Sequence, residues 1–364
     1  MISTGNSTAS TADTANTAVV SLGCLNKDVR MTMVPAGQLP ELARAALLGQ
    51  GFPADLADEV VTEFVTAELL GQRSHGLGKL ASLRFDGFDA VAEFVERGSV
   101  LTVNGAGASG LLVLRAVAAR LIERAGRQGV ALASVRNFSR HGALYPYTEI
   151  VARGGFVGIL MNSAGPAAVT PYGSIDPVTG TNPLCFSFPT PAGPHTLDFS
   201  TAEIVWGEIR QATLECRELP TGPFLDAGGA VTTTPSDVNA VKAFGGAKGW
   251  ALNLAIELLA GVLVGASSGL AVQDEFDCGA LMIAIDPNAT GAGAAFPESV
   301  RGLLEEVRQA RPAPGQARVR VPGDRRLQLP APTEVDIPPA TMALLQRLAT
   351  GEKVCELSSN PLLN

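Results

Sequence analysis

Three histidines are the side chains of this sequence best suited to proton transfer. Imidazole titrates near neutral pH, so a histidine on a glycine-rich loop can supply the proton that accompanies hydride addition to a carbonyl or imine. His75 lies between Ser74 and Gly76, and the neighbouring hydroxyl could hold or relay that proton. His141 follows a strand-like apolar run, whereas His195 lies in a turn in which we expect a solvated ring. His75 is therefore the candidate proton-transfer residue, against the alternative of an ordinary loop histidine.

Several other polar side chains could bind a small anion or an amide-bearing cofactor. The segment 180–183 offers a threonine hydroxyl and an asparagine amide in a tight turn, where neutral donors can fix a carboxylate or an amide. Asp198 and Glu208 flank a predicted strand-to-helix junction, and an acid close to a catalytic histidine would raise the pKa of the ring. Cations suited to phosphate oxygens occur at Lys248, Arg320, Arg325 and Arg326. Taken one at a time, each of these charged residues is by default a solvated surface group.

Residues 105–110 spell G-x-G-x-x-G ahead of a predicted helix, an arrangement in which glycine backbone and a helix N-terminus can receive a pyrophosphate. The apolar run before this motif, residues 100–103, is short, and no convincing strand with an acidic tip follows about twenty residues later. We therefore expect a glycine turn at the start of the next helix. A conventional Rossmann dinucleotide-binding domain remains the alternative.

The elements expected to position these residues are helices first and then mainly strands. Apolar residues at three- and four-residue spacing predict helices over 39–47 and 57–70, immediately before His75. Buried strands are predicted at 130–135, 155–161, 184–188 and 196–199. Because most of these strands follow one another through turns, we expect an α/β (α+β) fold with a mixed or antiparallel central sheet.

One apolar run, residues 250–272, is long enough to span a bilayer but contains Asn253 and Glu257. We expect this run to form a buried or dimer-interface helix and expect no membrane association. The net charge is −8 without a basic stripe, which argues against nucleic acid or an anionic membrane as a partner. Five cysteines form no CxxC pair and have no histidine at ligand spacing, so we expect reduced thiols, a cytoplasmic location and no metal site.

The length of 364 residues allows two or three lobes with cores of their own. Residues 1–33 are rich in Ser, Thr and Ala and lack the apolar core of a signal peptide, so we expect a disordered extension there. No self-similar period of about twenty to fifty residues is present, which argues against a repeat scaffold.

Six sequence blocks within residues 33–348 resemble, in the same order, the malate/L-lactate dehydrogenase family that lacks a Rossmann domain. The blocks lie at residues 74–79, 137–147, 171–184, 197–209, 245–249 and 320–326. The resemblance implies an oxidoreductase that uses NADPH or NADH and acts on a small-molecule carboxylate. It also implies a homodimer with a non-Rossmann, mixed-sheet cofactor domain beside a helical domain built from both chain ends.

The resemblance also implies domain boundaries and site residues. A helical substrate domain would comprise residues 34–135 and 291–350, a cofactor domain residues 136–290, and a tail residues 351–364. The implied catalytic residues are His75 as proton donor, Ser74 as its relay partner and Glu208. The implied substrate-binding residues are Lys79, Thr181, Trp206 and Gly207. The implied cofactor-binding residues are His141, Gly142, Ala143, Leu144, Tyr145, Asp198, Phe199, Ser200, Thr201, Ala247, Lys248, Arg320, Pro322, Gly323, Arg325 and Arg326.

Departures from the family pattern bear on the substrate. Lys79 stands where an arginine commonly binds the substrate carboxylate, so a point charge replaces a bidentate fork. Trp206 replaces an arginine or histidine, and Ala247 replaces a common histidine. Glu208 resembles the acid of the cyclic-imine reductases, which favours C=N over C=O reduction. We expect reduction of a 2-oxo acid or cyclic 2-imino acid with His75 as proton donor. The alternative is a family member that has lost catalysis and acts as a dimeric binding or scaffold subunit.

Overall fold

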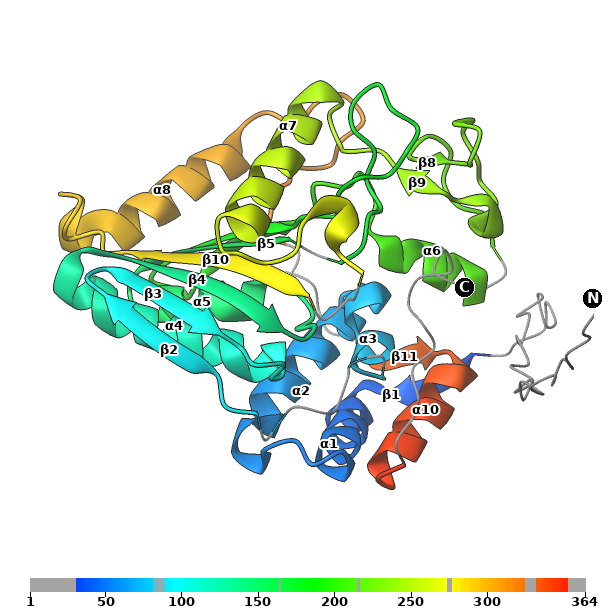
Figure 1. Cartoon of the computed structure of the whole chain (residues 1–364), viewed down its shortest axis with the longest axis horizontal. Helices are drawn as coiled ribbons and strands as arrows, with labels where there is room; N and C mark the ends of the chain where they lie inside the picture. The colour runs from blue at the N-terminus through cyan, green and yellow to red at the C-terminus, as the bar shows by residue number, and fades with distance from the viewer. Residues whose placement is uncertain are drawn as a thin grey trace, which may run out of the picture.

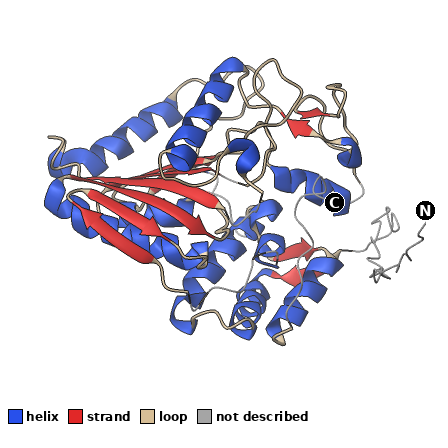
Figure 2. Ribbon diagram, viewed as in Figure 1, coloured by secondary structure: helices blue, strands red, loops and turns tan. Residues whose placement is uncertain are grey.

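A seven-stranded sheet crosses the middle of the molecule, with helices on both of its faces (Figures 1 and 2). The computed structural model describes residues 31–81, 83, 88, 90–163, 165–214, 217–273, 277–324 and 332–352. The strand order is β2-β3-β4-β10-β5-β6-β7, and β3 and β4 form the one parallel pair of this sheet among the described residues. The strands are β2 (Glu93–Arg97), β3 (Val100–Asn104), β4 (Val130–Phe138), β5 (Val157–Ser163), β6 (Leu184–Phe188), β7 (His195–Phe199) and β10 (Cys278–Ile285). The expected non-Rossmann fold with a mixed, mostly antiparallel sheet is confirmed.

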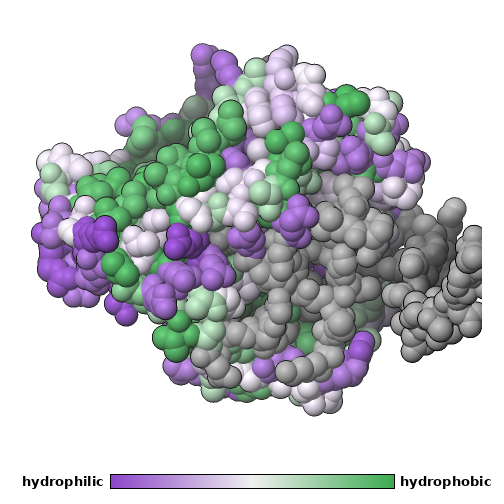
Figure 3. All heavy atoms as spheres, viewed as in Figure 1, coloured by the Kyte–Doolittle hydropathy of each residue, from purple (hydrophilic) through white to green (hydrophobic). Residues whose placement is uncertain are grey.

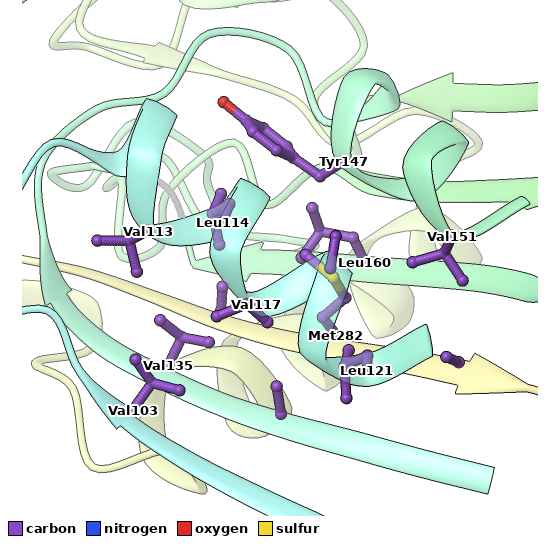
Figure 4. Packing of buried hydrophobic residues seen from close by; sticks show 14 of the residues in the cluster. Val103, Val113, Leu114, Val117, Leu121, Val135, Tyr147, Val151, Leu160 and Met282 are labelled. Atoms are coloured by element: carbon purple, nitrogen blue, oxygen red, sulfur yellow. The ribbon is translucent and has the colours of Figure 1, made fainter. Parts of the chain in front are cut away.

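Two helices, α4 (Gly110–Gln128) and α5 (Tyr145–Arg153), cover one face of the sheet (Figure 1). Leu114 and Leu121 of α4 point toward the sheet, where Met282 of β10 belongs to the same fully buried cluster (Figure 4). Burying a side chain of this size contributes about 1.5–3 kcal/mol relative to leaving it exposed. This cluster fixes the sheet on which the loops after β4 and β7 are carried.

The opposite face is covered by α7 (Ala247–Ile256) and the π-helical turn η4 (Glu257–Val262), with α8 (Phe296–Gln309) on the same side (Figure 1). Gly265, with φ +75°, follows this turn. A single regular helix through residues 250–272 is therefore wrong, because the α-helix ends at Ile256 and the π-turn ends at Val262. No helix in the described part of the chain is long and apolar enough to cross a membrane.

The two ends of the described chain meet in a helical layer beside the sheet (Figure 1). This layer contains α1 (Leu39–Gly49), α2 (Ala54–Leu69), α10 (Pro339–Ala349) and the antiparallel pair β1 (Thr32–Pro35) and β11 (Glu334–Ile337). Helices α1 and α10 approach closely, because a Cβ at Gly49 would lie 2.3 Å from the carbonyl oxygen of Leu348. The expected extension 1–33 therefore differs at its end, since Thr32 and Met33 belong to β1. Residues 1–30, and 353–364 of the expected tail, lie outside the described residues.

A third apolar cluster, in addition to those of the sheet and of the helical layer, includes Val169, Ile209 and Phe224. It is built from α6 (Trp206–Leu214), β8 (Phe224–Leu225) and β9 (Ala240–Val241) with their loops. The remaining short elements are η1 (Ala36–Gln38), η2 (Arg73–His75), α3 (Leu77–Ala81), η3 (Pro235–Asp237), η5 (Gly269–Ala271) and η6 (Gly293–Ala295).

Candidate active site

Ser74 and His75 form the end of the short helix η2, directly after α2. The Ser74 hydroxyl lies 3.0 Å from Nδ1 of His75, within hydrogen-bond distance. Because Ser74 engages Nδ1, Nε2 is the ring nitrogen left to exchange a proton with a ligand. The predicted pair of a histidine and a supporting hydroxyl is therefore present as a contact.

Helix α2 contacts the turn that carries His75 through a hydrogen bond from Glu68. Glu68, a buried acid of that helix, accepts a hydrogen bond from the backbone N–H of Leu77 at 2.8 Å. A Cβ at Gly76 would lie 2.1 Å from the same carboxylate oxygen, so an alanine there would displace the Glu68 carboxylate. Burial raises the pKa of Glu68, while the Leu77 hydrogen bond opposes this rise. Glu68 thus fixes where η2 ends and α3 begins.

The environment of His75 disfavours the charged imidazolium. Burial, and secondarily the positive charge of Lys79, lower the pKa of His75 to about 4. The ring is therefore neutral at pH 7 in the absence of ligands. A bound carboxylate would offset both causes, because its negative charge would favour the protonated ring.

His141 lies in the loop that follows β4. Burial lowers the pKa of His141 to about 4, and the charge of Lys79 contributes to this shift as well. His141 is buried, with Nε2 3.4 Å from Oδ1 of Asn162, and its carbonyl accepts a hydrogen bond from the Tyr147 hydroxyl at 2.7 Å. The His141 loop also packs against α2, the helix that precedes the His75 turn, because a Cβ at Gly142 would lie 3.4 Å from Cζ of Phe64.

The loop 141–145 is shaped by two acids. Gly142 has φ +82°, and a Cβ there would lie 2.8 Å from Oε1 of Glu63, so only glycine fits without a shift. Oδ2 of Asp198, at the end of β7, accepts hydrogen bonds from the N–H groups of Leu144 and Tyr145 at 3.1 and 3.0 Å. Asp198 therefore joins β7 to the start of α5, as an acid at a helix N-terminus is suited to do.

The segment after Asp198 is tied to the turn that contains Thr181. The carbonyl oxygen of Thr181 accepts hydrogen bonds from the hydroxyls of Ser200 and Thr201, both at 2.9 Å. The ring of Phe199 meets that of Phe244 edge-on with centroids 6.2 Å apart, and both rings are more than one third exposed. The predicted residues 198–201 and Thr181 are therefore contiguous, and Phe244 adds an aromatic ring beside them.

Helix α6 reaches the His75 turn at its first residues. A Cβ at Gly207 would lie 2.6 Å from Cβ of Ser74. Trp206 is half-buried and packs against the third apolar cluster. The carboxylate of Glu208 forms an ion pair with Arg217 at 2.5 Å. Gly207 therefore lies against the turn that carries His75, and Lys79 is the side chain whose charge lowers the pKa of His75.

The start of α7 has the properties of an anion-binding helix end. Gly245 and Gly246 have φ values of +61° and +63°, and Ala247 and Lys248 follow them, exposed, in the first turn of the ten-residue helix. Unpaired N–H groups and the helix dipole favour negative charge at such an end, and an exposed lysine adds to this preference. The segment 245–248 therefore favours an anion.

The C-terminal segment packs on the opposite end of β7. A Cβ at Gly323 would lie 2.4 Å from the carbonyl oxygen of Thr196 and 3.3 Å from Cε1 of His195. Pro322 and Arg320 are exposed beside it, and Arg325 and Arg326 lie outside the described residues. The expectation of a solvated His195 is wrong: the ring is 4% exposed because this distant segment covers it.

A family model described as malate/L-lactate dehydrogenase matches residues 34–345. The chain belongs to this family. It is similar to an L-lactate dehydrogenase of Cupriavidus necator, with 32% identity over 85% of this chain and 95% of that protein. It is also similar to a Δ1-pyrroline-2-carboxylate/Δ1-piperideine-2-carboxylate reductase of Pseudomonas syringae pv. tomato, with 33% identity over 74% and 83% of the two chains. A solved dehydrogenase from Sinorhizobium meliloti shares the fold with a TM-score of 0.76 and 30% identity, covering 88% of this chain and 99% of that one.

Membership in the malate/L-lactate dehydrogenase family confirms the expected enzyme class, an oxidoreductase. The hydrogen bonds of the G-x-G-x-x-G motif are consistent with this family, which lacks a Rossmann domain. The N–H groups of Gly105 and Gly107 donate to the carbonyls of Arg136 and Asn137 at 2.8 and 3.0 Å, and that of Gly110 donates to the Ser139 hydroxyl at 3.3 Å. These glycines serve close packing against the end of β4, so the Rossmann alternative is wrong.

Sequence reasoning missed several residues that hold the site of this family member. Glu63 and Glu68 are buried acids of α2, and Asn253 and Glu257 are buried polar residues of α7 and η4. The available signal was the same in each case: a polar residue at an apolar position of a helix. What such a residue binds could not be read from the sequence, because its partners come from other elements.

Proposed function

We propose that this chain reduces a 2-oxo acid or a cyclic 2-imino acid with NADH or NADPH, and that His75 protonates the carbonyl oxygen or the imine nitrogen. The observation that carries the proposal is the pairing of His75 with Ser74 beside Lys79, whose charge also reaches the His141 loop. Lys79 would bind the carboxylate of the acid, His75 would donate the proton, and the His141 loop would bind the cofactor.

The cofactor supplies the hydride, which is added to the carbon next to the carboxylate. Residues 141–145, residues 198–201, Ala247 with Lys248, and the C-terminal segment from Arg320 would hold it. The helix end at Lys248 supports this assignment, because the N–H groups of the three motif glycines at residues 105, 107 and 110 already donate to the end of β4 and the loop after it. Arg325 and Arg326 would extend the C-terminal part of this site.

His75 must be charged to donate a proton, although its pKa of about 4 keeps the ring neutral in the free protein. Binding of the substrate carboxylate next to Lys79 would offset the lysine charge and favour the imidazolium. Ser74 would keep the ring oriented by its contact with Nδ1. In the reverse direction the neutral ring would accept the proton from an alcohol or amine.

Lys79 would bind the substrate carboxylate, and Thr181, Trp206 and Gly207 would line the rest of the substrate. An ammonium lacks the two-pronged geometry of a guanidinium, so carboxylate orientation depends more on these neighbours. The two curated relatives are named for lactate and for cyclic imino acids, so both C=O and C=N substrates fit the proposal. Glu208 would favour the imine by the resemblance noted above, acting through its position beside Gly207.

The homodimer belongs to the same proposal and rests on an apolar surface of α7 and η4. Leu254, Leu258, Val262 and Leu263 are 40%, 50%, 57% and 64% exposed, and Leu303 of α8 is 62% exposed. Figure 3 shows apolar residues gathered on this side of the molecule. A monomer rarely exposes a contiguous surface of this kind, whereas a stable dimer covers one.

The direct test mixes the purified chain with NADH or NADPH and a panel of 2-oxo and cyclic 2-imino acids, and follows absorbance of the reduced cofactor. We expect consumption of one of the two cofactors with at least one acid. His75→Ala should lose about a hundredfold in kcat while binding the cofactor as well as the unaltered chain. Failure to bind either cofactor would refute the proposal and favour the binding or scaffold subunit.

A further inference from the structure

Two polar side chains interrupt the apolar run of α7 and η4, and neither has a role in the proposed chemistry. Asn253 and Glu257 are 0% and 4% exposed, in a region where most neighbours are aliphatic. They are four residues apart and so lie on one face of the helix. Both form hydrogen bonds with the turn that contains Thr181.

The turn has an unusual backbone at Asn182. This residue is fully buried and has φ +39°, a left-handed conformation that few residues other than glycine and asparagine adopt. Its side-chain amide donates to Oε2 of Glu257 at 2.7 Å and to the carbonyl oxygen of Asn253 at 3.2 Å. The two helix residues therefore stabilise the strained position directly.

Asn253 fixes the other side of the same turn. Its amide nitrogen donates to the carbonyl oxygen of Gly180 at 3.0 Å and to the Thr201 hydroxyl at 2.9 Å. Its amide oxygen accepts a hydrogen bond from the Thr179 hydroxyl at 2.6 Å. The residues on both sides of Thr181 are thus bound, while Thr181 itself stays partly exposed.

Glu257 connects the turn to a second segment. Its Oε1 accepts a hydrogen bond from the N–H of Gly269 at 2.7 Å, so each carboxylate oxygen faces an N–H donor. Glu257 is also the first residue of the π-turn η4, in which the N–H of Leu263 bonds to the carbonyl of Leu258 at 2.8 Å. π-Turns of this kind occur frequently at functional sites.

We propose that Glu257, with Asn253, is a positioning residue for the substrate-binding turn. It holds Asn182 in the left-handed conformation, so that the Thr181 side chain is presented to the bound acid. The inference rests on the proposed function only in assigning Thr181 to the substrate. Glu257→Gln keeps the size of the side chain but turns one acceptor into an NH2 group that must face an N–H donor.

The kinetic test compares Glu257→Gln with Glu93→Gln, an exposed glutamate of the edge strand β2. We expect Glu257→Gln to raise KM for the acid about tenfold or more and to leave the cofactor Kd within about twofold. Glu93→Gln should change neither constant.

The structural test measures hydrogen–deuterium exchange of a peptide covering residues 179–184 in the same variants. Faster exchange there in Glu257→Gln, with the oligomeric state unchanged by light scattering, supports the proposal. The proposal is overturned if Glu257→Gln changes neither the exchange rate nor KM. It is also overturned if KM, kcat and the cofactor Kd change in parallel with a general loss of stability. If the unaltered chain reduces no acid, the proposed function fails, while the exchange result still decides whether Glu257 holds the turn.

Discussion

Gly207 lies against Ser74, so closely that a methyl group at position 207 would come within 2.6 Å of the serine Cβ. Ser74 in turn contacts Nδ1 of His75. The space left for Ser74 and His75 is therefore set by α6, which begins far along the chain, and the absence of a side chain at Gly207 has a direct structural reason.

Gly207→Ala should displace Ser74 and misorient His75. We expect kcat to fall about tenfold, because small displacements at a proton-transfer site are costly, while cofactor affinity is retained. Gly126→Ala is a matched control, since it adds a methyl to another helical glycine, where the nearest atom, in Phe156, would be 3.6 Å away. Equal turnover of Gly207→Ala and the control would exclude this role of the contact.

Asp198→Asn should loosen the loop that would hold the cofactor. Asp198 accepts two backbone N–H groups at the start of α5, and loss of such a cap costs about 0.5–2 kcal/mol. We expect a lower free energy of unfolding and a several-fold higher cofactor Kd by fluorescence titration. Asp226 also accepts two N–H groups, those of Gly228 and Ala230, in an exposed turn. Asp226→Asn should therefore lower stability without changing the cofactor Kd, and a Kd shift of equal size in both variants would contradict the assignment.

The pH dependence of reduction should differ between kcat/KM and kcat. Burial and Lys79 hold the pKa of His75 at about 4 in the free protein, and in the proposed mechanism the protonated ring would be the donor. Since kcat/KM reports the free enzyme, it should fall as the pH rises above about 4. A bound carboxylate raises the pKa of the ring, so kcat should persist to higher pH before it falls. Initial rates between about pH 5 and pH 9 test this, and coincident profiles for the two constants would argue against His75 as donor.

The apolar surface of η4 should be needed for dimer formation. Leu263→Glu places a carboxylate in that surface, and we expect the sedimentation coefficient or light-scattering mass to shift from dimer toward monomer. Val91→Glu is the control, because Val91 is 81% exposed and precedes the edge strand β2. A dimer that survives Leu263→Glu, or a chain that is monomeric without any substitution, would remove this surface from the proposal.

Local sequence patterns predicted the strands well where the strand and its turns are contiguous. The ranges 184–188 and 196–199 match β6 (Leu184–Phe188) and β7 (His195–Phe199) to within one residue. The insertion of β10 between β4 and β5 could not be predicted, because no local signal specifies a partner so distant in sequence. The burial of His195 was missed for the same reason, since Gly323 covers it from another part of the chain.

The contacts of the candidate site also fall into two groups, those between neighbours in sequence and those between distant elements. Ser74 and His75 are neighbours in sequence, so their contact could be anticipated from the motif alone. The support that Glu68 gives to Leu77, and that Glu257 gives to Asn182, depends on packing of separate elements. Sequence reasoning could therefore name the groups that would react, and only the structure identifies the residues that hold them.

The most direct test of the central claim follows the hydride itself. The chain is supplied with reduced cofactor carrying deuterium at C4, on either face of the nicotinamide in separate reactions, and with the acid that gives turnover. We expect a product with one deuterium on the carbon next to the carboxylate, delivered from one of the two faces of the nicotinamide. A product without deuterium at that carbon, formed at the same rate from both labelled cofactors, would contradict it.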